Sequence, residues 1–134
     1  MSITVRRDAG RHGLRHSVHV RDHVIGIDAS PGAGGEDAGA EPHDLYDAAL
    51  GACKVLTLLV YAKRKGIPVD DVEVVIARDD SGERQGVYKL KASLRVTGSL
   101  SDAQRDELMR VAGKCPVHKL MTEVSTEIET VWAT

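Results

Sequence analysis

The chain contains two cysteines, Cys53 and Cys115, and their side chains are the ones best suited to chemistry. An ionised cysteine sulfur is a nucleophile, and it can be oxidised reversibly to a sulfenic acid or a disulfide. No C-x-x-C redox motif is present, so any pairing of the two must come from the fold. Free cysteine is also among the most buried residue types, and a small core residue is therefore the alternative at each position.

The surroundings of Cys115 favour an ionised sulfur more than those of Cys53. Cys115 precedes Pro116, a residue typical of the first turn of a helix, so we expect Cys115 at or near a helix N-cap. Unpaired N–H groups and the positive end of the helix dipole stabilise an anion there, and neighbouring lysines and a histidine add positive charge. Cys53 lies in an apolar run, residues 48–62. It needs a cation from elsewhere, such as the Arg-rich segment near the N-terminus.

Apolar periodicity and turn residues predict the elements that position these cysteines. β-Branched residues separated by turns predict an antiparallel meander over 3–7, 14–20 and 23–27. The Gly-rich segment 30–40 follows as a mobile loop, and it lacks the Gly-Lys-Ser/Thr ending of a phosphate loop. Residues 44–65 then predict a long helix, buried because it is apolar nearly all round, with Cys53 near its midpoint.

The second half of the chain predicts a hairpin and two further helices. Alternating residues over 88–97, preceded by 71–78, indicate two antiparallel strands. Ser101 and Gln104 form the sequence of a capping box, so a helix begins there and ends at Gly113. A short helix from Pro116 to about residue 122 and a final strand over 123–132 complete a single α+β domain, residues 1–134.

Composition limits the classes of partner. The formal net charge is −2 and only 3% of residues are aromatic, which argues against a nucleic-acid platform of stacked bases and cations. The first residues lack the apolar region of a signal peptide, and the apolar run contains Lys54 and is too short for a bilayer span. We therefore expect a cytoplasmic protein without a membrane partner, in a compartment where permanent disulfides are unusual.

Two motifs together resemble the OsmC/Ohr family of osmotically inducible and organic-hydroperoxide-resistance proteins, and its OsmC-like branch in particular. The stretch DLYDAALGAC, residues 44–53, is similar to the segment before that family's first cysteine. The stretch KCPVHKLM, residues 114–121, is similar to its second cysteine motif. The resemblance covers nearly the whole chain and includes the order of elements.

The resemblance implies an intertwined homodimer with buried central helices and two equivalent sites at the subunit interface. By analogy, Cys53 would attack an organic hydroperoxide and become a sulfenic acid, and Cys115 would resolve it as a disulfide. An external dithiol such as a lipoyl protein would reduce that disulfide, and no metal or organic cofactor is needed.

The resemblance also assigns supporting residues, with departures. Family peroxidases carry a glutamate ten residues before the first cysteine, and this chain has His43 there, with Asp44 beside it as a substitute. The family arginine comes from the N-terminal meander, where Arg15 is preferred over Arg11. His43 and Tyr46 are the expected substrate-binding residues, although core packing is the alternative for Tyr46 and Tyr61.

Besides a peroxidase, two alternatives follow from the sequence: a binding or sensing module and a small metal-binding protein. The His43 departure is compatible with a non-enzymatic ligand-binding or redox-sensing module on the same fold. Cys115 and His118 have zinc-like spacing, and four histidines recur between residues 12 and 23, but paired short spacings are lacking. We therefore expect no metal site.

Overall fold

The computed structural model describes every residue of the chain except position 11. Contacts divide the chain into two compact units, residues 1–47 and residues 48–134. Whether these units form one domain stays a prediction from the sequence.

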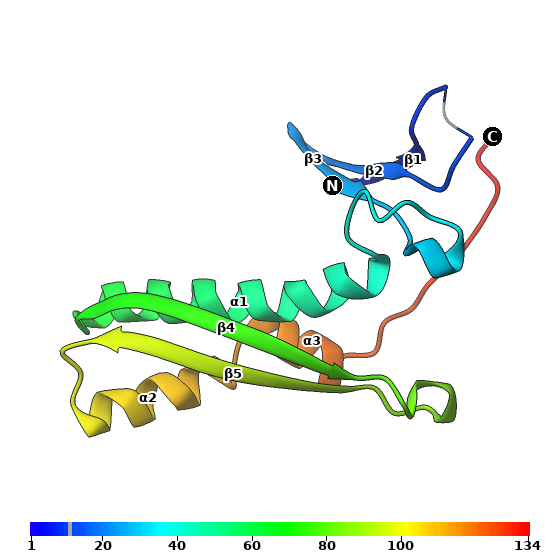
Figure 1. Ribbon diagram of the computed structural model, residues 1–134. Coiled ribbons are helices and arrows are strands. Elements are labelled where there is room, and N and C mark those ends of the chain that lie inside the picture. Colours follow the sequence, from blue (N-terminus) through cyan, green and yellow to red (C-terminus); the bar gives the residue numbers. More distant parts are fainter. Residues whose placement is uncertain (11) are drawn as a thin grey trace. The chain divides into compact units, whose positions relative to one another are not determined.

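The first unit is built on a three-stranded antiparallel sheet, in the order β1-β2-β3 (Figure 1). The strands are β1 (Thr4–Arg7), β2 (His16–Val20) and β3 (His23–Ile27), which confirms the expected meander. A two-residue turn joins β2 to β3, with Val20 opposite His23. Arg21 in this turn has a φ of 52°, because tight hairpin turns need left-handed backbone.

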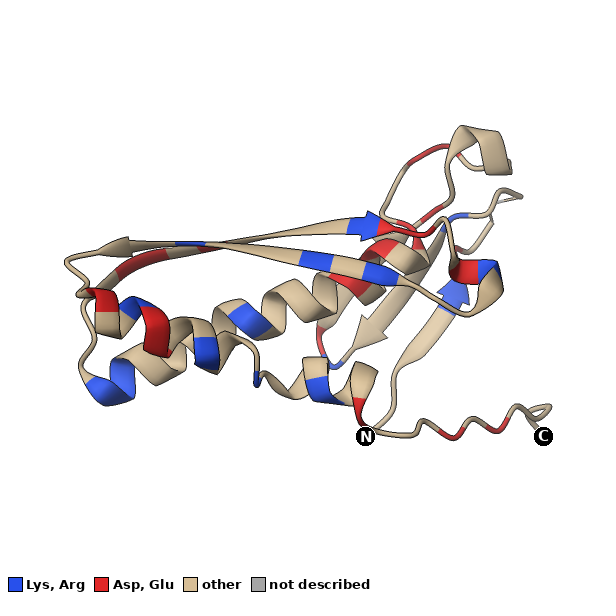
Figure 2. Cartoon of the chain, turned by 90° about the horizontal axis from the view of Figure 1, so that it is seen from below, with Lys and Arg blue, Asp and Glu red and all other residues tan. Residues whose placement is uncertain are grey.

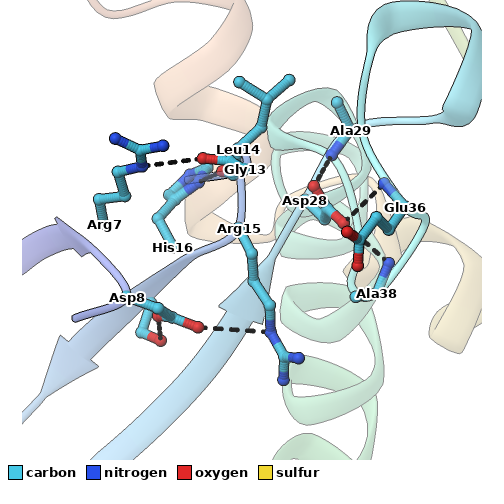
Figure 3. Close-up of polar contacts among 11 residues, drawn as sticks. Arg7, Asp8, Gly13, Leu14, Arg15, His16, Asp28, Ala29, Glu36 and Ala38 are labelled. Carbon is cyan, nitrogen blue, oxygen red and sulfur yellow. Dashed lines mark hydrogen bonds and ion pairs between the residues drawn. The ribbon is translucent and has the colours of Figure 1, made fainter. Parts of the chain in front are cut away.

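The Gly-rich loop after β3 is held in place by the carboxylate of Asp28, which is 3% exposed. Its two oxygens accept backbone N–H bonds from Ala29, Glu36 and Ala38 at 2.8, 3.0 and 3.1 Å (Figure 3). The Ala38 N–H, followed by that of Ala29, lowers the pKa of Asp28 by stabilising the carboxylate. At Gly39 a Cβ would lie 2.6 Å from the carbonyl oxygen of Gly26, so only glycine fits. The loop contains the 3-10 turn η1 (Pro31–Ala33). Hydrogen bonds to Asp28 anchor it, whereas the sequence predicted a mobile loop.

Helix α1 (Pro42–Lys65) begins in the first unit and continues through the second. Pro42 stands in its first turn and three cationic residues in its last turn, as the sequence predicted. Along α1 lies an antiparallel hairpin of β4 (Val69–Asp79) and β5 (Lys89–Gly98), connected through η2 (Glu83–Gln85) (Figure 1). Alternate residues of β5 face inward, which confirms the predicted period of two.

Two shorter helices complete the second unit. α2 (Asp102–Ala112) starts with the predicted capping box, in which Ser101 and Gln104 bond each other's backbone N–H groups. α3 (Pro116–Thr122) has Cys115 as its N-cap, as predicted. The core between α1, α2 and the hairpin is aliphatic: its buried members are Leu58, Ala62, Ile67, Leu108 and Ala112.

The predicted final strand, Glu123–Trp132, is wrong for this chain: no strand is assigned to these described residues. The alternating side chains face solvent, and Ile128, Val131 and Trp132 are 84%, 75% and 96% exposed. Alternation makes a segment suitable for a sheet, but a strand also needs a neighbouring strand to bond with. Trp132 is therefore not a core residue of the chain.

Helix α1 is also less buried than its composition predicted. Leu56, Leu59 and Val60 are 62%, 42% and 46% exposed, because the hairpin and α2 cover only the opposite side. By length and composition alone α1 is suited to cross a membrane, contrary to the sequence expectation, and 33% of its most apolar window is buried. That is weak evidence, since the core helix of a soluble protein passes the same test. Lys and Arg are intermixed with Asp and Glu along the hairpin and α2 (Figure 2).

Candidate active site

The fold of the second unit brings Cys53 and Cys115 near one another, as the proposed pairing requires. Both thiols are free. Cys53, on α1, is half-buried, whereas Cys115 is 0% exposed. A molecule arriving from solvent therefore meets the sulfur of Cys53 first.

The sulfur of Cys53 occupies a position at the start of α3. The backbone N–H of Val117 donates to Cys53 Sγ at 3.5 Å. The first N–H groups of a helix have no partner within the helix, and the Cys115 side chain makes no capping bond. Cys53 thus fills the role of a cap from another helix. Thr57 Oγ1, one turn further along α1, lies 4.0 Å from the same sulfur.

The next residue, Lys54, belongs to the environment of the other sulfur. Its side chain is only 5% exposed. Its Nζ donates to the carbonyl of Ala112 at 2.7 Å and lies 3.8 Å from Cys115 Sγ. It also lies 3.1 Å from Nδ1 of His118; an ammonium has no acceptor, so Nδ1 accepts and the ring hydrogen sits on Nε2.

Lys54 is the residue of this site that sequence reasoning missed. The available signal was a single lysine inside an otherwise apolar run. A lysine is almost never fully buried unless its charge is compensated. The sequence predicts an assisting cation among the N-terminal arginines, whereas Lys54 lies directly beside Cys53 in the sequence and contacts Cys115.

An open, mainly apolar groove of about 670 Å³ runs along α1 beside Cys53. Its lining includes Leu56, Val60 and Tyr61 of α1, with Val111 of α2 and Val117 of α3. The Tyr61 hydroxyl donates to Glu107 Oε2 at 2.6 Å, and this bond to a carboxylate raises the pKa of Tyr61. The groove would offer apolar contact to a small molecule that reaches the accessible sulfur.

The other site residues expected from the sequence lie in the first unit. Arg15 forms an ion pair with Asp8, with Nε 3.4 Å from Oδ2 (Figure 3). Asp44 accepts the backbone N–H of Glu41 at 3.0 Å, at the start of α1. A role for Arg15 and Asp44 in assisting Cys53 stays a prediction.

Two further predicted site residues occupy neighbouring positions. His43 and Tyr46 are exposed on the first turns of α1, and the tyrosine that lines the groove of the second unit is Tyr61. Their substrate-binding role stays a prediction, and Arg11 lies outside the described residues. Within the described part of the chain, no three His, Cys, Asp or Glu side chains gather as a metal-ligand group.

Comparison with known proteins places this arrangement in a family. A family model described as OsmC-like protein matches residues 34–130. No curated protein sequence matches the chain significantly.

Solved structures share the fold. An OsmC-like protein from Mycoplasma pneumoniae is 19% identical, with a TM-score of 0.72, over 92% of this chain and 87% of that one. An organic hydroperoxide resistance protein OsmC from Legionella pneumophila is 20% identical, with a TM-score of 0.62, over 92% and 90%. The organic hydroperoxide resistance protein OhrB of Bacillus subtilis is 25% identical, with a TM-score of 0.58, over 92% of each chain.

Proposed function

Because the chain belongs to the OsmC-like protein family, we propose that it is a thiol-dependent peroxidase that reduces organic hydroperoxides through Cys53 and Cys115 in defence against oxidative stress. The observation that carries the proposal is the pair of thiols with unequal exposure beside an apolar groove. The names of the Legionella and Bacillus relatives, which are hydroperoxide resistance proteins, support the substrate class.

In the proposed reaction the Cys53 thiolate attacks the distal oxygen of the hydroperoxide. An S–O bond forms, the O–O bond breaks, and the alkoxide takes up a proton and leaves as an alcohol. The Cys115 sulfur then displaces hydroxide from the Cys53 sulfenic acid, giving a disulfide and, after protonation, water. An external dithiol such as a lipoyl protein returns both sulfurs to the thiol state, and no metal or organic cofactor takes part.

In this proposal the more accessible cysteine, Cys53, reacts with the peroxide. The buried cysteine, Cys115, needs to reach only the sulfur of Cys53. The N–H of Val117 supports negative charge on Cys53. Arg15 and Asp44 are proposed to assist Cys53, and His43 and Tyr46 to contact the substrate. A cytoplasmic location, where reductants keep both thiols free, is part of the proposal.

The test is a stopped-flow measurement of cumene hydroperoxide consumption with a dithiol as reductant. We expect Cys53→Ser to abolish turnover and Cys115→Ser to permit oxidation of Cys53 without recycling. After one equivalent of hydroperoxide, intact-mass analysis should record the loss of two hydrogens, mapped to a Cys53–Cys115 link. Unchanged turnover in Cys53→Ser would reject the proposal. For the arginine, Arg15→Met should slow the first step, while Arg6→Met, on strand β1 of the same unit, serves as the charge-matched control.

A second candidate is a ligand-binding or redox-sensing module, favoured by His43 at the position where the family resemblance has glutamate. In that case the groove would hold an apolar ligand and the thiols would oxidise slowly. Peroxide consumption at the rate of free cysteine, with saturable binding of an apolar ligand, would support this function over the first.

We also propose that the working form is a homodimer. The exposed apolar side chains of α1 and the uncovered C-terminal segment, residues 123–134, are the surfaces that a second copy would cover. Light scattering should give twice the chain mass, and Leu56→Arg should weaken association. Met109→Arg, at an exposed apolar position of α2, is the matched control and should leave the dimer intact.

A further inference from the structure

Lys54 is a buried cation that the proposed peroxidase steps do not use. Among the described residues no carboxylate forms an ion pair with it, although its side chain is 5% exposed. A buried charge is costly unless another charge or well-placed dipoles compensate it. The ammonium must therefore be balanced by the groups that surround Nζ.

Those groups lie at the junction of α2 and α3. The carbonyl of Ala112, at the negative end of α2, accepts one hydrogen bond, and Nδ1 of His118 accepts another. Both are neutral. The third neighbour is the sulfur of Cys115, which can carry a full negative charge.

The other titratable groups near this junction do not supply an anion. Lys114 and Lys119 are exposed and positive, and Cys53 faces the groove. The Cys115 sulfur is therefore the group whose ionisation would neutralise Lys54. Cys115 is 0% exposed, and burial makes an uncompensated thiolate unfavourable. The Lys54 ammonium and a Cys115 thiolate would therefore stabilise each other.

We propose that Lys54 is a positioning residue that holds the sulfur of Cys115 as an anion in the reduced protein and thereby makes a Cys53–Cys115 disulfide easier to reduce. The disulfide itself rests on the proposed function; the ion pair in the reduced protein does not.

The consequence for the redox steps follows from the charges. When Cys115 attacks the sulfenic acid of Cys53, an S–S bond forms, an S–O bond breaks, and hydroxide leaves and is protonated to water. Cys115 loses its negative charge in that step, and Lys54 is left without a counter-charge. Reduction restores it: a thiolate of the external dithiol attacks the groove-facing sulfur of Cys53, and Cys115 departs as a thiolate beside Lys54. Stabilising the reduced form in this way makes a disulfide more oxidising.

The experiment compares wild type, Lys54→Met and Lys54→Gln in the full chain. Methionine removes the charge at similar volume, and glutamine also keeps a donor for the Ala112 carbonyl. Lys63→Met, at an exposed position in the last turn of the same helix, is the charge-matched control. The first readout is the equilibrium between disulfide and dithiol in dithiothreitol buffers at pH 7, and the second is the ultraviolet absorbance of thiolate in the reduced proteins.

We expect both Lys54 variants to shift the equilibrium toward the disulfide by tenfold or more and to lose thiolate absorbance, with Lys63→Met within twofold of wild type. Equal equilibria and equal absorbance in wild type and the Lys54 variants would overturn the inference. If wild type forms no Cys53–Cys115 disulfide, the proposed function fails, and the absorbance alone decides on Lys54. If Lys54→Met does not fold, Lys54→Gln decides.

Discussion

The backbone N–H of Val117 donates to Sγ of Cys53 over 3.5 Å, so a side chain of one helix completes the start of another. Val117 follows Cys115 by two positions, and this bond fixes α1 and α3 at the point where the two sulfurs approach each other. This contact therefore has a structural role, which can be measured without any substrate.

Replacing Cys53 should separate the capping contact from helix propensity. Inside a helix, serine is less favourable than alanine by about 0.5 kcal/mol, so Ala49→Ser, at an exposed position of α1, should cost that amount. At position 53 the serine oxygen can accept the Val117 N–H, a bond worth about 0.5–1.5 kcal/mol. Urea denaturation under reducing conditions should therefore find Cys53→Ser at least as stable as Cys53→Ala. The capping contact would be contradicted if Cys53→Ser were less stable than Cys53→Ala by as much as Ala49→Ser is less stable than wild type.

Shortening Leu58 should be among the most destabilising changes in the chain. Leu58 is 0% exposed in the core between α1, α2 and the hairpin. Leu58→Ala leaves a cavity, and we expect a loss of about 2–5 kcal/mol in the free energy of unfolding. Met109→Ala, at a position that is 59% exposed, should stay within about 0.5 kcal/mol of wild type. Similar losses in the two variants would mean that Leu58 is not a core residue.

The bond between Tyr61 and Glu107 should make stability depend on alkaline pH. The pKa of Tyr61 is raised above 10.0 in the folded chain by the Glu107 carboxylate. A raised folded pKa means that the contribution is complete below pH 10.0 and is lost as the pH rises through the folded value. In a double-mutant cycle of Tyr61→Phe and Glu107→Gln, the coupling energy should be constant at neutral pH and fall above pH 10.0. A coupling that persists unchanged in strong alkali would contradict the hydrogen bond.

The carboxylate of Asp28 should make the Gly-rich loop sensitive to acid. Because N–H donors lower its folded pKa below 3.8, its stabilising contribution is present above pH 3.8 and is lost as the pH falls through the folded value. The amide signals of Glu36 and Ala38 should shift in that range. In Asp28→Asn one of the two accepting oxygens becomes an NH₂ group, which donates and cannot accept a backbone N–H, so hydrogen exchange of these amides should accelerate at pH 7. Asp37→Asn, in the same loop with a φ of 53°, removes the same charge and should leave them protected.

Local signals in the sequence predicted most of the fold. The capping box at Ser101, the proline after Cys115 and the period of two in β5 each act within a few residues, and each is confirmed. The position of Cys115 at a helix start was predictable for the same reason. Periodicity also separated the buried from the exposed face of the hairpin.

The features that the sequence did not predict depend on contacts with residues far along the chain, which periodicity does not identify. The alternation of the C-terminal segment indicates which side chains share a face, but it gives no neighbouring strand. Lys54 finds its acceptors 58 to 64 residues further along the chain, and only the packing of α1 on α2 and α3 determines them. The choice between Tyr46 and Tyr61 as the groove tyrosine likewise depends on where the hairpin and α2 lie along α1.

The exposure of Trp132 has a spectroscopic consequence. It is the chain's single tryptophan, and the residue is 96% exposed in the apolar C-terminal segment. Fluorescence from a free chain therefore reports only on that tail, and its emission will be red-shifted and readily quenched by iodide. Any surface that covers the tail will shift the emission to the blue, so dilution of the native protein becomes a direct optical assay for what the C-terminal residues touch.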